Sequence, residues 1–152
     1  MKFIQIASLA IVLALTFVSS VFSQETRIGD LIIQHTTIRA TPPKAPVSGG
    51  YMTIKNTGST SDWLIGGSVS FAKKVEVHEM KMDGEIMKMR QLVGGLEIPA
   101  GGEVTLKPGG LHIMFMKLSE RMSVGEKRMV KLMFKNAGEV EIEFEVKKPM
   151  AH

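Results

Sequence analysis

Apolar and polar residues alternate with a period of two in several short segments of this chain, as in strands with one buried and one solvated face. The clearest case is residues 141–146, in which three glutamates alternate with Ile142, Phe144 and Val146. Similar segments predict strands at residues 31–40, 50–56, 74–80, 86–92, 102–106, 111–118 and 127–135. No segment keeps a helical period over three turns, so we expect an all-β protein with little helix.

Clusters of glycine, proline, asparagine and serine separate these segments and predict turns between the strands. The longest cluster is residues 41–50, and a compact signal for a two-residue hairpin turn is Asp83-Gly84. Seven or eight short strands at this spacing favour an antiparallel β-sandwich or a partly closed barrel. With 152 residues and no repeat or linker, the chain should form one domain.

The N-terminus has the pattern of a secretory signal peptide. Lys2 gives a positive start, residues 3–18 are mostly apolar, and small residues lead to a cleavage site predicted after Ser23. The apolar run is shorter than the ~20 residues that a membrane-spanning helix needs, so we expect no stable membrane insertion after cleavage. Residues 1–23 are thus predicted to be the signal, and residues 24–152 a single domain with its core at about 31–147.

Composition narrows the possible chemistry. The chain has no cysteine, which excludes disulfides, a lipid-modified cysteine and the thiolate ligand of a blue-copper electron carrier. Its net charge of +4 comes from basic residues spread along the chain, and aromatic residues make up only 6% of it. Nucleic-acid binding therefore has little support. In an oxidising compartment methionine is the sulfur ligand that stays available, because a thioether cannot form a disulfide.

Two histidines and two methionines in predicted strands are candidate metal ligands: His78, Met89, His112 and Met114. Imidazole and thioether together suit a soft, monovalent ion, and Cu(I) is the natural candidate. A hairpin turning on Asp83-Gly84 would place His78 directly opposite Met89 and Met80 opposite Met87, close enough to share one ion. His112 and Met114 are two residues apart, so they should project from one face of their strand.

Core packing is the alternative explanation for these residue types, and the pattern alone leaves both open. Methionine commonly fills cores, and we expect this role for Met52, Met122, Met129 and Met133. Met80, Met82, Met87 and Met116 flank the proposed site and could be extra sulfur ligands or packing. His35 is expected to make an ordinary hydrogen bond in its strand. His152 also lacks suitable partners nearby in sequence.

Three segments resemble the PCu(A)C family of periplasmic copper chaperones. They are His78-Glu79-Met80 through Met87-Lys88-Met89-Arg90, residues 95–102, and residues 106–114, which end in Leu111-His112-Ile113-Met114. Gly50-Tyr51-Met52-Thr53-Ile54 is similar to the N-terminal half of that family, and the resemblance spans residues 31–147. It implies a cupredoxin-like β-sandwich and a Cu(I) site made of His78, Met89, His112 and Met114.

The resemblance also implies a monomeric periplasmic carrier rather than an enzyme. Such a carrier would supply copper to the binuclear copper site of cytochrome c oxidase subunit II, often alongside Sco-type proteins. Some relatives carry a long tail rich in His and Met, whereas this chain ends at residues 147–152 without one. A secreted β-sandwich interaction module, with methionines used for packing and no metal role, is the alternative from another class. A hydrolytic zinc site would more typically recruit a carboxylate or a third histidine.

Overall fold

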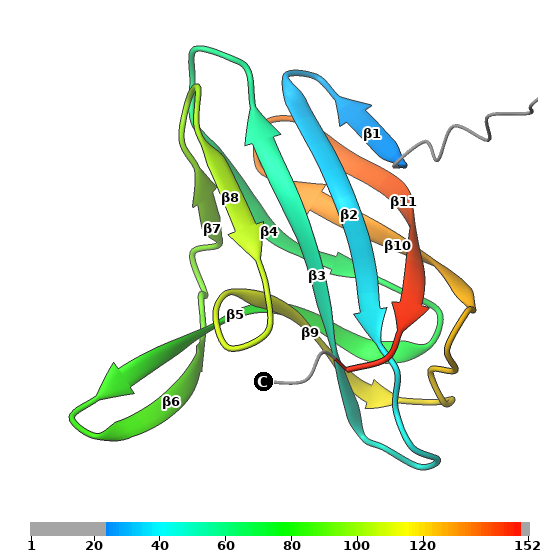
Figure 1. Ribbon diagram of the computed structural model, residues 1–152. Coiled ribbons are helices and arrows are strands. Elements are labelled where there is room, and N and C mark those ends of the chain that lie inside the picture. Colours follow the sequence, from blue (N-terminus) through cyan, green and yellow to red (C-terminus); the bar gives the residue numbers. More distant parts are fainter. Residues whose placement is uncertain (1–23, 150–152) are drawn as a thin grey trace, which may run out of the picture.

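The computed structural model describes residues 24–149, and all regular structure in that range is β-strand (Figure 1). The strands are β1 (Glu25–Ile28), β2 (Leu31–Arg39), β3 (Val47–Asn56), β4 (Asp62–Ser68), β5 (Ala72–Asp83), β6 (Ile86–Gln91), β7 (Leu96–Ile98), β8 (Glu103–Leu106), β9 (His112–Leu118), β10 (Lys127–Phe134) and β11 (Gly138–Lys147). The predicted all-β fold is confirmed. Residues 1–23, the predicted signal peptide, and His152 lie outside the described residues.

The strands form one sheet in the order β6-β5-β9-β3-β2-β11-β10-β4-β7, with β1 paired to β2 and β8 to β3. The sheet bends back on itself, so that β4 comes close to β5 through Gly66 and Gly67 (Figure 1). One pair departs from the predicted antiparallel arrangement, because β11 runs parallel to β2. Among the described residues, no helix is long and apolar enough to cross a membrane.

Strands β1, β4 and β7 were not among the predicted segments. β4 contains Gly66-Gly67 within only seven residues, a composition that indicates a turn rather than a strand. β3 begins at Val47, inside the stretch predicted as a loop, and includes Gly49 and Gly50. The reason is close packing, because a Cβ on Gly50 would lie 2.8 Å from the Phe115 ring. These glycines make room for a neighbour instead of turning the chain.

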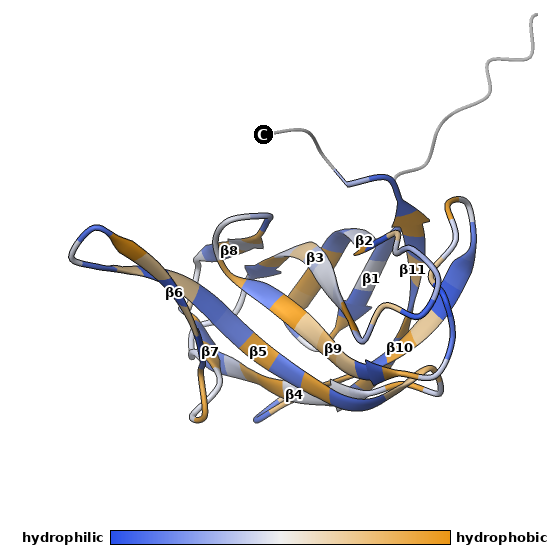
Figure 2. Cartoon of the chain, turned by 90° about the horizontal axis from the view of Figure 1, so that it is seen from below, coloured by the Kyte–Doolittle hydropathy of each residue, from blue (hydrophilic) through white to orange (hydrophobic). Residues whose placement is uncertain are grey.

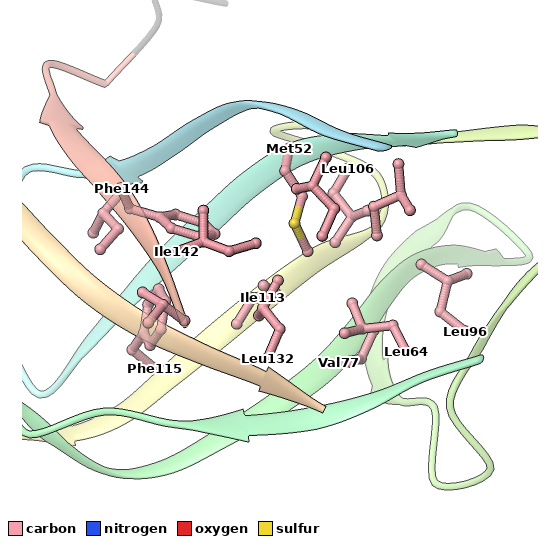
Figure 3. Close-up of a cluster of buried hydrophobic side chains, with 14 of the residues drawn as sticks. Met52, Leu64, Val77, Leu96, Leu106, Ile113, Phe115, Leu132, Ile142 and Phe144 are labelled. Carbon is pink, nitrogen blue, oxygen red and sulfur yellow. The ribbon is translucent and has the colours of Figure 1, made fainter. Parts of the chain in front are cut away.

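The core lies between the two layers that the bent sheet creates (Figure 3). Its side chains come from both layers and include Met52, Leu64, Val77, Leu96, Leu106, Ile113, Phe115, Leu132, Ile142 and Phe144. Ile113 and Phe115 of β9 both point into this core, and so does Val77 of β5. Because side chains alternate along a strand, His78, His112 and Met114 are directed to the opposite face.

The β5–β6 hairpin has a different register from the predicted one. His78 pairs with Gln91, Met80 with Met89 and Met82 with Met87, so the prediction that His78 lies directly opposite Met89 was wrong. The turn consists of Gly84 and Glu85, and Gly84 has a φ of 65°. A two-residue turn with positive φ at its first position favours glycine there, which moves the turn one residue along the chain. The paired positions move by two, so Met89 stays on the same face as His78.

The outer part of this hairpin projects beyond the body of the domain (Figures 1 and 2). β6 is the end strand of the sheet and is exposed along its whole length. The inner part of β5, from Ala72 to His78, pairs with β9, whereas its outer part, from His78 to Asp83, pairs only with β6. The hairpin is therefore anchored at His78 and free at its tip.

Candidate metal centre

The two predicted site histidines face each other across β5 and β9. His78 pairs directly with His112 in the ladder, and their ring centroids are 5.8 Å apart. Both are only 7% exposed. Val77 and Ile113, the adjacent residues in the two strands, are buried in the core and anchor both strands. The fold therefore brings two imidazoles from segments more than 30 residues apart into one place.

A residue just before β9 orients the ring of His112, and the ring points at a sulfur atom. Its Nδ1 lies 3.0 Å from the carbonyl oxygen of Gly110, which can only accept, so Nδ1 donates the hydrogen bond. In the neutral ring Nε2 then carries a lone pair, and it lies 3.2 Å from Sδ of Met89. Burial lowers the pKa of His112, the nearby His78 acts in the same direction, and the Gly110 hydrogen bond opposes both. A lowered pKa keeps the ring neutral, as a metal ligand requires.

His78 has one ring nitrogen engaged and the other free. Its Nε2 donates to Oε2 of Glu76 at 2.8 Å, because a carboxylate accepts. Within residues 24–149, Nδ1 of His78 is a buried side-chain nitrogen that has no hydrogen-bond partner. Buried polar atoms are nearly always paired, so an orphaned one calls for an explanation. A bound metal ion would supply the missing partner, and Glu76 would orient the ring as a neighbouring carboxylate does in many metal sites.

Three of the four predicted site residues line one open cavity of about 470 Å³: Met89, His112 and Met114. His78 is not in its lining but lies against His112. Met80 also lines the cavity. The pairing of Met80 with Met89 explains this, and the predicted register had placed Met80 opposite Met87. The structure therefore gathers all four predicted residues and adds a third thioether beside them.

A tyrosine that was not singled out from the sequence forms part of the cavity wall. Tyr51 of β3 lines the cavity, and its hydroxyl would lie 2.7 Å from a Cβ on Gly49. Gly49 is paired with Met114 in the ladder. The missing side chain at Gly49 therefore gives the Tyr51 ring its place in this wall. The Gly49-Gly50 pair was a possible signal for such close packing, but Gly49 was assigned to the turn-rich stretch 41–50, and the strand was predicted to begin only at Gly50.

The donor atoms here are imidazole nitrogens and thioether sulfurs. In the part of the chain that the structure describes, no three His, Asp, Glu or Cys side chains are grouped so that they could hold a metal ion. A metal at this centre would therefore have to draw on methionine. That donor set fits a soft monovalent ion with a filled d shell better than Zn²⁺, Mg²⁺ or Ca²⁺.

The other predicted roles are confirmed in part. Met52 and Met122 are buried in the core as expected, whereas Met129 is 52% exposed, so its packing role was wrong. Met129 belongs to the outward face of β10, where the alternation with Val130 places it. Met133 is half-buried. His35 is exposed, with a φ of 57° at a bulge in β2.

The sequence matches a family of putative lipoproteins. Residues 31–146 match the sequence model of the family described as putative lipoprotein LpqE-like. The putative lipoprotein Lxx21020 from Leifsonia xyli subsp. xyli (strain CTCB07) is 37% identical over 81 residues, which make up 53% of this chain and 49% of that protein. The aligned part therefore spans about half the length of this curated relative.

Solved structures with a similar fold are PCuAC domains. The copper-bound PCuAC domain from PmoF2 superposes with a TM-score of 0.71 at 27% identity, over 83% of this chain and 99% of that domain. The solution structure of CuI-DR1885 from Deinococcus radiodurans superposes with a TM-score of 0.65 at 26% identity, over 84% of this chain and 83% of that protein. The resemblance to PCu(A)C proteins is thus confirmed for the fold, including the predicted cupredoxin-like class.

Proposed function

Because the chain belongs to the LpqE-like family of putative lipoproteins and folds like PCuAC domains, we propose that it is an exported Cu(I) carrier. The ligands in this proposal are His78, Met89, His112 and Met114. The observation that supports it most strongly is the 3.2 Å approach of His112 Nε2 to Met89 Sδ. The unpartnered buried Nδ1 of His78 lies in the adjacent ring. Two of the PCuAC structures with this fold are described as copper-bound or Cu(I)-bound.

The cargo is Cu(I) rather than Cu(II) because thioether sulfur is a soft donor. Cu(I) has a filled d shell and accepts two, three or four ligands, so the four side chains do not have to impose one geometry. Glu76 and the Gly110 carbonyl each hold one imidazole hydrogen and so set the orientation of the two rings. The residues thus provide fixed nitrogen donors on one side and flexible sulfur donors on the other.

A carrier fits this centre better than an enzyme. All four proposed ligands are neutral when they bind, and neutral thioethers hold Cu(I) less tightly than thiolates do. Met89 belongs to the exposed end strand β6, so its sulfur is the donor that an acceptor protein reaches first. Handover would then begin with the exchange of Met89 for a ligand of the acceptor, while copper stays Cu(I) throughout.

X-ray absorption at the copper K-edge tests the proposed ligand set. After anaerobic loading with one equivalent of Cu(I), we expect an edge typical of Cu(I) and a first shell with both nitrogen and sulfur neighbours. A Met89→Leu, Met114→Leu variant should lose the sulfur shell, whereas Met129→Leu, which changes an exposed methionine on β10, should keep it. Failure of the wild-type protein to retain copper would contradict the proposal and favour the interaction module without a metal role.

The proposed acceptor is the binuclear copper site of cytochrome c oxidase subunit II, reached in the periplasm with the help of Sco-type proteins. The support is the resemblance to PCu(A)C chaperones and the similarity to putative lipoproteins. Mixing the Cu(I)-loaded protein with the apo copper domain of subunit II under anaerobic conditions should move copper to that domain, because its thiolates bind Cu(I) more tightly. Separation of the two proteins and metal analysis measure the transfer. Retention of copper by the carrier, with and without a reduced Sco-type protein, would contradict this acceptor.

A further inference from the structure

The projecting β5–β6 hairpin carries four methionines on one face. Met80 is directly opposite Met89, and Met82 is directly opposite Met87. Side chains alternate along each strand, so residues 80 and 82 share a face with residues 87 and 89. His78 is on the same face at the inner end of the β5–β6 ladder. Two consecutive thioether pairs therefore extend from the candidate metal centre to the tip of the hairpin.

The other face of the hairpin is charged. Arg90 donates to Glu79 across the ribbon, and Lys88 donates to Asp83 near the turn. These ion pairs link β5 to β6 from the side away from the sulfur atoms. The methionine face is thus left clear of charged side chains from its own hairpin.

Packing does not explain three of these four methionines. Met82, Met87 and Met89 are 53%, 50% and 47% exposed, whereas the core methionines Met52 and Met122 are at most 1% exposed. Apolar side chains that stay half exposed contribute little hydrophobic stabilisation to the fold. An end strand that only had to be soluble would carry polar residues on this face. The pattern at the hairpin tip therefore indicates a binding role for the thioethers.

We infer that Met80, Met82 and Met87 form a second, outer binding site for Cu(I), separate from the centre at His78 and His112. Directly opposed residues have Cβ atoms about 4.5 to 5.5 Å apart, and diagonal neighbours about 7 to 8 Å apart, which long side chains can bridge. Met82 and Met87 form the direct pair, and Met80 is the diagonal neighbour of Met87. Three flexible thioethers can therefore converge on one soft ion, with Met89 left to the inner centre. The inference rests on the proposed function for the identity of the metal.

The outer site should bind copper more weakly than the inner one. It offers only thioethers, and its side chains lose rotamer freedom when they are drawn out of solvent onto an ion. The inner centre has two imidazoles that are already buried and oriented. We expect the second equivalent of Cu(I) to bind at least about tenfold more weakly than the first. Since Met80 lines the inner cavity as well, the two sites adjoin each other.

An anaerobic Cu(I) titration of protein labelled with ¹³C at the methionine methyl groups tests the inference. The first equivalent should shift the Met89 and Met114 signals, and the second should shift those of Met82 and Met87. Competition with a Cu(I) chelator gives the two affinities. In a Met82→Leu, Met87→Leu variant, which keeps side-chain size but removes sulfur, the second binding step should disappear and the first should remain. The control Met129→Leu, an exposed methionine on another strand, should retain both steps.

A His78→Ala, His112→Ala variant separates the outer site from the proposed function. Continued shifts of Met82 and Met87 with Cu(I) in that variant would support an independent outer site. One-step binding by the wild-type protein, with Met82 and Met87 unchanged, would overturn the outer site and leave the inner centre intact. An unchanged second step in the Met82→Leu, Met87→Leu variant would also overturn it, because the second copper ion would then bind elsewhere. If the wild-type protein bound no copper at all, both the outer site and the proposed function would be overturned.

Discussion

Replacement of His78 and His112 together by alanine is expected to lower the affinity for Cu(I) by at least about 100-fold. Loss of a residue that only orients a metal ligand typically costs 10-fold to 100-fold, and this change removes two proposed ligands. Both side chains face away from the core, and His78 has a buried nitrogen with no partner, so their removal should leave the fold intact. Titration against a Cu(I) chelator, together with the unfolding curve of the apo-protein, measures both effects.

His35→Asn is the matched control for this pair. His35 is exposed in β2 and has a φ of 57°, a conformation that asparagine tolerates better than alanine. Its substitution should leave Cu(I) affinity unchanged, so nonspecific binding by histidine would show as a loss in the control. An affinity within about threefold of wild type in the folded His78→Ala, His112→Ala variant would rule out the proposed centre, because two missing ligands cannot cost so little.

Phe115→Ala is expected to lower the free energy of unfolding by about 3 to 5 kcal/mol, as for other large aromatic side chains removed from a core. The Phe115 ring is fully buried, packs 5.2 Å from the Phe71 centroid, and occupies the space that Gly50 leaves open. Such a loss is a large part of the stability of a domain of this size.

Urea unfolding of the apo-protein measures this effect, with Val124→Ala as the control. Val124 is exposed, so its truncation should change stability by no more than about 0.5 kcal/mol. A loss below about 1 kcal/mol for Phe115→Ala would contradict the close packing of β9 on β3. Because Phe115 follows Met114 in the same strand, the variant should also weaken Cu(I) binding through looser placement of that thioether, without removing any donor.

The alternation of polar and apolar residues was enough to predict an all-β protein and to tell which residues of a predicted strand share a face. The alternation along the sequence puts Val77 and Ile113 on the face opposite to His78 and His112, and both are buried in the core of the structure. The prediction from local pattern failed at glycines, which can either turn the chain or make room for a neighbouring side chain. Gly49 was assigned to a turn-rich stretch and Gly66-Gly67 to no strand, but all three are strand residues at points where a neighbour comes close. Only the packed neighbour distinguishes these cases.

The register of the β5–β6 hairpin also could not be predicted from local pattern alone. Asp83-Gly84 correctly indicated a two-residue turn, but the turn consists of Gly84-Glu85, and the cross-strand partners shifted by two positions. The face of each residue did not change, which is why the metal hypothesis did not depend on the shift. The shift did change the partner of Met80 and created the two methionine pairs of the hairpin.

The sequence by itself determined the all-β class, the shared faces of the residues around His78 and His112, and a soft donor set without cysteine, because these follow from the two-residue period and from side-chain chemistry. Only the tertiary structure decided that His78 lies opposite His112, that Met89 comes within 3.2 Å of it, and that β11 runs parallel to β2. The physical reason is that contacts between distant strands depend on how the whole sheet bends and packs around its core. No local pattern encodes that arrangement.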